Sequence, residues 1–437
     1  MNRKGVRWLY EELPGLVGGG VISSDAAEAL RRHYGDLGEG RWRQVILTIC
    51  GVLGALLVGL GIIFVLAHNW SAIPRSVRTV LALAPLVAAQ GAAAWVIWRR
   101  EASAAWREGT AVFLAMALGA AIALIDQTYH TGGDYDAMLL PWMLLGLPLV
   151  YLLGSTATAV LYLAAVLGWA GCADLHGVQR LAIWLLALLV GPHWWLAARQ
   201  DRYGLRSVFL GWAVALWAGL ALEFVLEGGG DLSWFVGFPA VYAVLYLAGC
   251  EWFAEGASVW RRPLQTVGAA GVVVAAYVLS FRWVWEHVEF HHLWDKAWQG
   301  EAVAAGGTVA VATVAALALL GFAVRRGQWW RVMVGGAPLV AVLGVALAGA
   351  TDAASAPAWL FNAYVLALAV GAMAVGIRDR RLAMANIGAF MVALLIVARF
   401  FDSEMGFLVK GVACIVIGAG FLATNVIYHR LRGGAAR

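Results

Sequence analysis

The sequence predicts an all-α membrane protein: a polytopic bundle of about fourteen transmembrane helices preceded by a short polar segment. Hydrophobic residues make up 62% of the 437-residue chain and charged residues only 13%, whereas soluble domains carry about 25% charged residues. Apolar runs close to the ~20 residues that cross a bilayer recur from residue 44 to the C-terminus. These observations favour an integral membrane protein over a chain of soluble domains.

The first 43 residues are polar, and we expect them to form a cytoplasmic segment of two short helices. The first helix is predicted at Val6–Val17, with an interruption at Pro14. The second is predicted at Ser24–Tyr34, because Ser23-Ser24-Asp25 followed by Glu28 is a helix-start pattern. No apolar stretch with a small-residue cleavage site occurs in this segment, so no secretory signal is expected.

The multi-spanning domain is predicted at residues 44–428, and a cytoplasmic tail at residues 429–437. The predicted spans are 44–68, 77–98, 108–128, 137–154, 157–175, 180–198, 206–227, 232–250, 264–285, 302–324, 331–351, 358–377, 382–400 and 404–428. The fourth and fifth spans are short and are joined only by Gly154-Ser155-Thr156. They are either two full spans, strongly tilted, or a re-entrant pair.

Basic residues are distributed unevenly between the two sides of the predicted bundle. With the N-terminus in the cytoplasm, 24 of the 31 Lys and Arg residues fall in inside segments and 6 in outside segments, and Lys410 lies in the last span. The positive-inside rule therefore predicts that both termini are cytoplasmic. The preference for Arg over Lys and the abundance of Ala and Gly indicate a GC-rich bacterial genome, and with it a location in the inner membrane. The same distribution explains the net charge of +5 without nucleic-acid binding.

Motifs for cofactors and metals are not found in the sequence. The four cysteines have no C-x-x-C spacing, and no Walker A loop, G-x-S-x-G elbow, H-E-x-x-H or dinucleotide fingerprint occurs. Nucleotide-driven catalysis is therefore not expected, and we expect no cofactor. His287 and His291 have the spacing of a zinc pair on one helix face, but four Trp residues between 283 and 298 favour an amphipathic helix in the headgroup region. We therefore expect no metal site.

Polar and ionisable residues gather at the predicted outer ends of the spans. The third span ends in Asp126, Gln127, Tyr129 and His130, and an imidazole beside a carboxylate could exchange protons near neutral pH. Glu223 lies near the outer end of the seventh span. A capped helix end with an interfacial Tyr is the structural alternative for the third span.

The last two predicted spans meet at a charged junction. Arg399 and Asp402 are three residues apart and could form an ion pair, while Lys410 lies inside the last span. Lys410 either extends towards water at the outer face or pairs with a buried acid. Because ionisable residues inside membrane spans are usually functional, we expect these residues to belong to a binding or proton-relay site.

Three functions are consistent with such a site. The first is a transporter or channel-like protein for a small or lipid-like solute, with the bilayer as its surroundings and no nucleic-acid partner. The second is a membrane enzyme that acts on a lipid-linked substrate, with His130 as general base. The third is a sensor or assembly partner whose polar N-terminal segment contacts another protein.

Three stretches of the sequence resemble a known family: GLVGGGVIS with AHNWSAIPRSVRTVLALAPLVAAQ, then DQTYHTGGDYDAMLLPWMLLGLPLVYLLGS, and finally RFFD at 399–402. They resemble the bacterial membrane proteins grouped as domain of unknown function 2157, over about the first 155 and the last 40 residues. The matching residues are Asn69, Trp70, Ile73, Pro74, Arg75, Gln127, Tyr129 and His130. Asp126 departs from the pattern, where a small residue is more usual. The resemblance implies a bacterial integral membrane protein and no particular activity.

Overall fold

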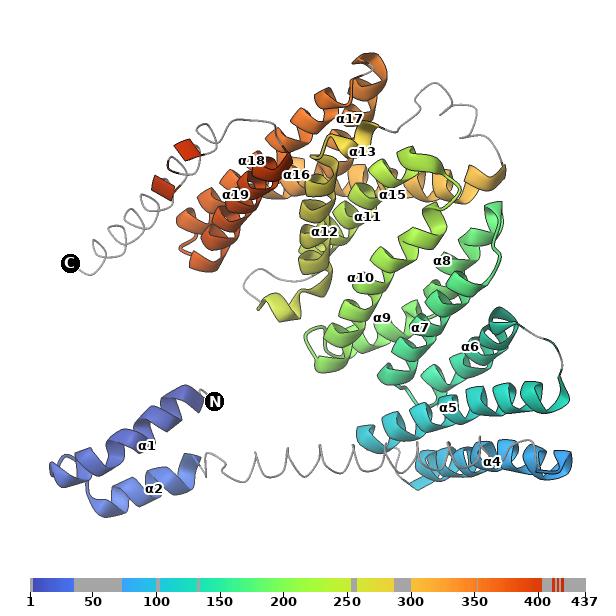
Figure 1. Cartoon of the computed structure of the whole chain (residues 1–437). Helices are drawn as coiled ribbons and strands as arrows, with labels where there is room; N and C mark the ends of the chain where they lie inside the picture. Colours follow the sequence, from blue (N-terminus) through green and yellow to red (C-terminus); the bar gives the residue numbers. More distant parts are fainter. Residues whose placement is uncertain are drawn as a thin grey trace. The chain divides into compact units, whose positions relative to one another are not determined.

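The computed structural model describes residues 3–34, 73–99, 103–130, 132, 134–252, 258–286, 300–351, 353–402, 411–412, 415 and 418–419. All regular elements in these residues are helices, as Figure 1 shows. The predicted all-α class is therefore confirmed for the described part of the chain. Contacts between residues divide the chain into two units, residues 1–80 and 81–437.

The first unit contains the helices α1 (Arg3–Gly18) and α2 (Ser24–Tyr34). The predicted interruption of the first helix is wrong, because α1 continues through Pro14. The hydroxyl of Tyr10 donates to the carbonyl of Arg31 at 3.2 Å and joins the two helices. At the start of α2, the hydroxyl of Ser23 accepts the N–H of Ala26 at 3.2 Å, as expected of an N-cap residue.

The second unit consists of helices that follow one another along the chain (Figure 1). In order they are α4 (Arg75–Arg99, whose first turn belongs to the first unit), α5 (Ala104–Tyr129), α6 (Tyr135–Leu152), α7 (Thr156–Cys172), η2 (Gly177–Arg180), α8 (Leu181–Leu188), α9 (Gly191–Gln200), α10 (Leu205–Leu226), α11 (Gly230–Trp252), η3 (Val259–Arg261), α12 (Pro263–Leu279), α13 (Trp283–Glu286), η5 (Gly300–Ala302), α15 (Val303–Arg325), α16 (Trp329–Gly335), α17 (Ala337–Thr351), α18 (Ser355–Arg378) and α19 (Leu382–Asp402).

Helix α10 joins two groups of helices within this unit. On one side it packs against α7 and α9, and α7 in turn packs against α5 and α6. On the other side it packs against α11, α12 and α15, and this group continues through α17 and α18 to α19 (Figure 1). Trp217 of α10 is buried and donates its indole N–H to the carbonyl of Leu163 in α7 at 2.8 Å. The order of helices in the chain is thus largely kept in space.

Nine helices in the described residues are long and apolar enough to cross a membrane, or up to ten if the bent pair α16–α17 is counted as one span. Two further apolar helices, α7 and α12, have 17 residues each. Each predicted span within the described residues coincides with one of these helices or helix pairs. The predicted total of fourteen is not confirmed: the span at 44–68, and all but a few residues of the span at 404–428, lie outside the described residues.

Three predicted spans differ from the structure in their detail. The segment 180–198 consists of η2, α8 and α9, with a break just before Gly191-Pro192. The segment 331–351 bends by 46° between α16 and α17, where Pro338 has no N–H to continue the helix. The segment 264–285 ends as a helix at Leu279. Trp285 of α13 then donates its indole N–H to the carbonyl of Leu279 at 2.8 Å.

Small residues bring two helix pairs into close contact. A Cβ at Gly268 in α12 would collide with the backbone nitrogen of Tyr246 and approach the carbonyl oxygen of Tyr242 to 2.7 Å, both in α11. A Cβ at Gly388 in α19 would collide with the carbonyl oxygen of Ala369 in α18. Such backbone proximity is typical of helices that associate in lipid, where packing replaces the hydrophobic effect.

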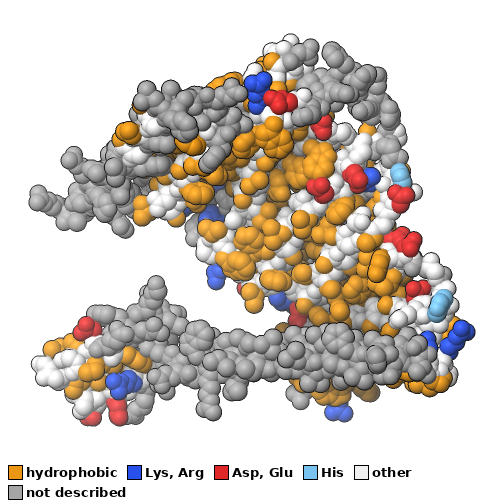
Figure 2. Space-filling model, in the orientation of Figure 1, with side chains coloured by type: hydrophobic (Ala, Val, Ile, Leu, Met, Phe, Trp, Pro, Cys, Tyr) orange, Lys and Arg blue, Asp and Glu red, His pale blue; other side chains and the backbone are white. Residues whose placement is uncertain are grey.

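Apolar side chains form a broad area on the face of the second unit shown in Figure 2, with charged side chains near its margins. Exposed apolar residues on α8 and α10 contribute to the surface of the unit: Leu185, Leu188, Leu216 and Leu220 are each more than half exposed. A soluble protein rarely exposes so large an apolar surface. The surface therefore fits contact with lipid.

Replacing Gly268 by alanine is expected to destabilise the protein by about 1–3 kcal/mol, because the added methyl group would overlap backbone atoms of α11 that cannot move aside. Gly321→Ala in α15 is the matched control, since a Cβ there meets no atom within 4 Å. Thermal unfolding of the purified protein in detergent measures both. Equal midpoints for the two variants would contradict the close packing of α11 and α12.

Candidate functional site

The residues predicted at the end of the third span lie on the last turn of α5. Asp126 is half-buried, whereas Gln127, Tyr129 and His130 are exposed. His130 ends the helix with a left-handed backbone conformation (φ 55°), and its N–H donates to the carbonyl of Asp126 at 2.7 Å. The hydrogen-bonded backbone thus fixes the spacing of the imidazole and the carboxylate on one helix end.

Glu223 is exposed on α10, one turn before an ion pair that the sequence did not indicate. Arg180 at the end of η2 donates to the carboxylate of Glu227 at 2.7 Å and to the carbonyl of Phe224 at 2.7 Å. The guanidinium group is largely buried, with a side-chain exposure of 12%. This contact fixes the end of α10 to the beginning of α8.

Arg399 lies at the end of α19 and contacts the residues that follow α12. Its guanidinium group donates to the hydroxyl of Ser280 at 3.0 Å and lies 4.6 Å from the ring centre of Phe281. Ser280 is fully buried, and its carbonyl also accepts the side-chain amide of Asn362 in α18 at 3.1 Å. Arg399 therefore joins three helices, which gives it a structural role in addition to any functional one.

The predicted site residues are distributed over helices that are not principal neighbours. Helix α5 packs mainly against α6 and α7, and α19 packs mainly against α18. Asp126 and Arg399 therefore belong to different parts of the helix bundle. Lys410 lies outside the described residues, as do His287, His291 and the side chain of Asp402. No cluster of three metal-ligating side chains occurs in the part of the chain that the structure describes.

The start of α5 and the turn between α6 and α7 carry a polar network that sequence reasoning missed. Glu108, in the second turn of α5, accepts the hydroxyl of Ser155 at 2.5 Å and the N–H groups of Thr156 and Ala157 at 2.9 and 3.0 Å. The carboxylate thereby caps the N-terminus of α7, where unpaired N–H groups and the helix dipole favour a negative charge. It fixes the turn between α6 and α7 to α5.

Two arginines contact the same turn. Arg206, near the start of α10, donates to the hydroxyl of Thr156 at 3.2 Å and to the carbonyl of Gly154. A Cβ at Gly154 would lie 3.7 Å from a terminal nitrogen of Arg206 and 3.8 Å from one of Arg107, so both guanidinium groups reach this position. We call Arg107, Glu108, Arg206 and residues 154–156 the turn cluster.

Several buried polar atoms on helices that carry or adjoin the turn cluster have no hydrogen-bond partner among the residues that the structure describes. His193 in α9 is 6% exposed, and its Nε2 has no hydrogen-bond partner. Two buried hydroxyl groups, of Thr158 in α7 and Ser207 in α10, also have none. The indole of Trp194 donates to the carbonyl of Ser207 at 3.1 Å, which places α9 and α10 side by side at this level. Such groups cost about 1–3 kcal/mol each unless water or a ligand satisfies them.

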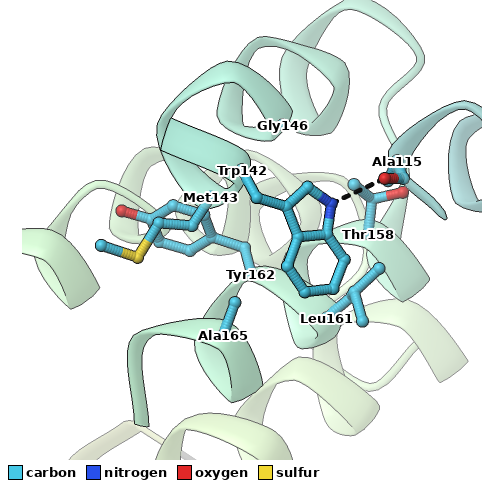
Figure 3. A pocket seen from close by; sticks show the side chains of 8 residues that line it. All are labelled: Ala115, Trp142, Met143, Gly146, Thr158, Leu161, Tyr162 and Ala165. Atoms are coloured by element: carbon cyan, nitrogen blue, oxygen red, sulfur yellow. Dashed lines mark hydrogen bonds between the residues drawn. The ribbon is translucent and has the colours of Figure 1, made fainter. Parts of the chain in front are cut away.

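A small apolar hollow lies deeper between α5, α6 and α7 (Figure 3). Its volume is about 10 Å³, which is enough for one water molecule. The indole of Trp142 extends across it and donates to the carbonyl of Ala115 at 2.7 Å, and the unpartnered hydroxyl of Thr158 lines one side (Figure 3). The hollow is too small for an organic solute.

The sequence contains only part of the signal for the turn cluster. Arg107 and Arg206 belong to the basic residues that the positive-inside rule places on the inner side, and Glu108 begins the third predicted span. Gly154-Ser155-Thr156 before an apolar run is an N-cap pattern, but nothing local in the sequence connects Glu108 to that turn. Because Glu108 and Ser155 are 47 residues apart, their contact is visible only in the structure.

The helices, their apolar surface and the polar groups at their ends define a multi-spanning membrane protein. A family model described as "Predicted membrane protein (DUF2157)" matches residues 15–159, so the resemblance inferred from the sequence motifs is confirmed over this segment. The segment includes the Ile73-Pro74-Arg75 element, at whose Arg75 α4 begins, and the whole turn cluster except Arg206. Comparisons with curated proteins and with solved structures gave no match.

Replacing Glu108 by alanine is expected to destabilise the protein by about 1.5–3 kcal/mol, because the N-terminus of α7 loses a charged acceptor. Glu286→Ala is the control, since Glu286 forms an exposed ion pair with Arg282 within one short segment, which contributes less than about 1 kcal/mol. Thermal unfolding in detergent compares the two. A Glu108→Ala variant as stable as the control would refute the capping role.

Proposed function

We propose that the protein is a transporter or channel-like protein of the bacterial inner membrane for a small or lipid-like solute. As binding and proton-relay residues we propose those that the sequence predicts at or near the outer ends of the spans: Asp126, Gln127, Tyr129, His130, Glu223, Arg399, Asp402 and Lys410. The general rarity of ionisable groups in membrane helices supports this assignment. So does the concentration of acidic residues at the ends of α5 and α10.

One observation carries the proposal: α5 has ionisable residues near both ends. Glu108 lies in its second turn, in contact with α7, and Asp126 lies in its last turn, half-buried. A helix that only anchors a bundle in lipid has no need of a half-buried carboxylate at this depth, and such a group is costly there. Because the carboxylate of Glu108 caps α7, Asp126 is the carboxylate of α5 that a solute or proton would meet at the outer face.

The proposed orientation places both termini and the helix ends at Arg206, Arg326 and Arg378 in the cytoplasm. Ion pairs of Glu251 with Arg326 at 2.6 Å and with Arg331 at 3.0 Å join helix ends on this face. We call it the arginine end. The opposite end, with His130 and Asp134, faces the periplasm in this arrangement.

Single cysteines are expected to report this orientation in intact cells. In a chain without its natural cysteines, Asp134→Cys at the start of α6 should react with a membrane-impermeant maleimide, because it faces outwards. Asp379→Cys, equally exposed after α18, should react only after the cells are permeabilised. Labelling of the second cysteine in intact cells would show that the orientation is reversed.

Asp126→Asn is expected to lower uptake of the transported solute by proteoliposomes about tenfold, because a charge-assisted contact is lost. A panel of radiolabelled small solutes, tested with and without a pH gradient, identifies the solute. Asp379→Asn is the control, since this exposed acid lies at the arginine end and pairs with the neighbouring Arg378. Lys410→Ala tests the other end of the proposed site. The absence of specific uptake, or of any effect of both site variants, would remove the transport proposal.

A further inference from the structure

We propose that the turn cluster binds a phosphate group through Arg107 and Arg206. The site lies at the arginine end, away from the outer residues assigned to transport, so the inference does not depend on that proposal. It rests on three observations within the described residues: an arginine whose buried Nε has no hydrogen-bond partner, a carboxylate that already accepts three hydrogen bonds, and further buried polar atoms that lack hydrogen bonds.

The two guanidinium groups differ in how they are held. Arg206 is fixed by its bonds to Thr156 and Gly154. The Nε of Arg107 is buried and has no hydrogen-bond partner, although one of its terminal nitrogens reaches the same turn. An anion beside Gly154 would therefore be within reach of both arginines, one of which is already positioned.

The negative charge of Glu108 does not balance the positive charges of both arginines. Its carboxylate oxygens accept the Ser155 hydroxyl and two backbone N–H groups of α7, so its charge is used to cap that helix. One acid facing two arginines leaves one positive charge without a counter-charge in the turn cluster. Such an excess charge at the end of apolar helices favours an anionic ligand.

The buried groups beside the cluster point to a polar ligand as well. The imidazole of His193 lies within electrostatic range of Arg206 and Glu108, and its edge is packed against the ring of Tyr151 at 6.1 Å between ring centres. Its unpartnered Nε2 and the hydroxyl of Ser207 are both more than nine-tenths buried. A phosphate or its bound water would supply the acceptors and donors that these atoms lack.

Phosphate fits this arrangement better than a carboxylate. Its oxygens are arranged so that two guanidinium groups can bind different edges, and arginine binds phosphate in a bidentate manner. The phosphate could belong to a lipid headgroup, because the turn is at the end of membrane-length helices, or to a free ion. The shared chemistry is a phosphate oxyanion, and the test distinguishes the two sources.

The experiment measures thermal unfolding of the full-length protein in a neutral detergent. The added probes are dihexanoyl phosphatidylglycerol, dihexanoyl phosphatidylcholine and inorganic phosphate at matched ionic strength. We expect phosphatidylglycerol or inorganic phosphate to raise the midpoint in a saturable manner, and phosphatidylcholine to raise it less because its headgroup has no net charge. Saturation by the lipid alone assigns a headgroup, and saturation by inorganic phosphate assigns a free anion; either supports the site.

Variants test whether the arginines are responsible. Arg107→Gln should raise the probe concentration at half-saturation about tenfold. Arg107→Lys, which keeps the charge but not the planar fork of the guanidinium group, should raise it less. Arg325→Gln is the matched control: Arg325 is an exposed arginine at the end of α15. Because the buried Nε of Arg107 has no hydrogen-bond partner among the described residues, its variants should fold as the parent does. No saturable shift with any probe, or equal effects of Arg107→Gln and Arg325→Gln, would overturn the inference.

Discussion

The lack of water in the bilayer is the constraint on which the structure depends. Inside hydrocarbon, every backbone N–H and C=O must be satisfied within the protein, and only the helix ends are left with unpaired groups. The chain meets this need at the α6–α7 turn with Glu108, whose carboxylate accepts two N–H groups of α7. At the other face, Arg180 donates to the carbonyl of Phe224 near the end of α10. Charged side chains at the helix ends thus complete the hydrogen bonding that the helices cannot.

Between the ends, packing has to replace the hydrophobic effect, because lipid is as apolar as the side chains. Small residues make this possible. Gly268 and Gly388 allow backbones of adjacent helices to touch, and aromatic residues fill the wider spaces. Trp285 is one example: it lies 4.6 Å from Phe235 and 6.0 Å from Phe361 between ring centres. Tight contact and large rings together hold α11, α12 and α18 in one group.

Hydropathy predicted where the helices lie but not where they bend. A broken span contains as many apolar residues as a continuous one, so its hydropathy does not reveal the break. The positions of the prolines do not predict the bends either. Pro239 lies inside the continuous helix α11, whereas Pro192 follows the break before α9 and Pro338 follows the bend after α16. Whether a proline interrupts a membrane helix depends in general on whether neighbouring groups satisfy the carbonyl that it leaves unpaired. That information is in the tertiary contacts and not in the local sequence.

For the candidate sites, too, the sequence predicted positions along the chain, and only the structure showed the contacts. The sequence located Asp126, His130 and Arg399 at span ends, since ionisable residues stand out against apolar runs. It did not show that Arg399 contacts Ser280, 119 residues away. An arginine fixed in this way has part of its hydrogen-bonding capacity committed to the fold. The proposed role of Arg107 rests instead on two features: its buried Nε has no hydrogen-bond partner among the described residues, and one of its terminal nitrogens lies beside Gly154.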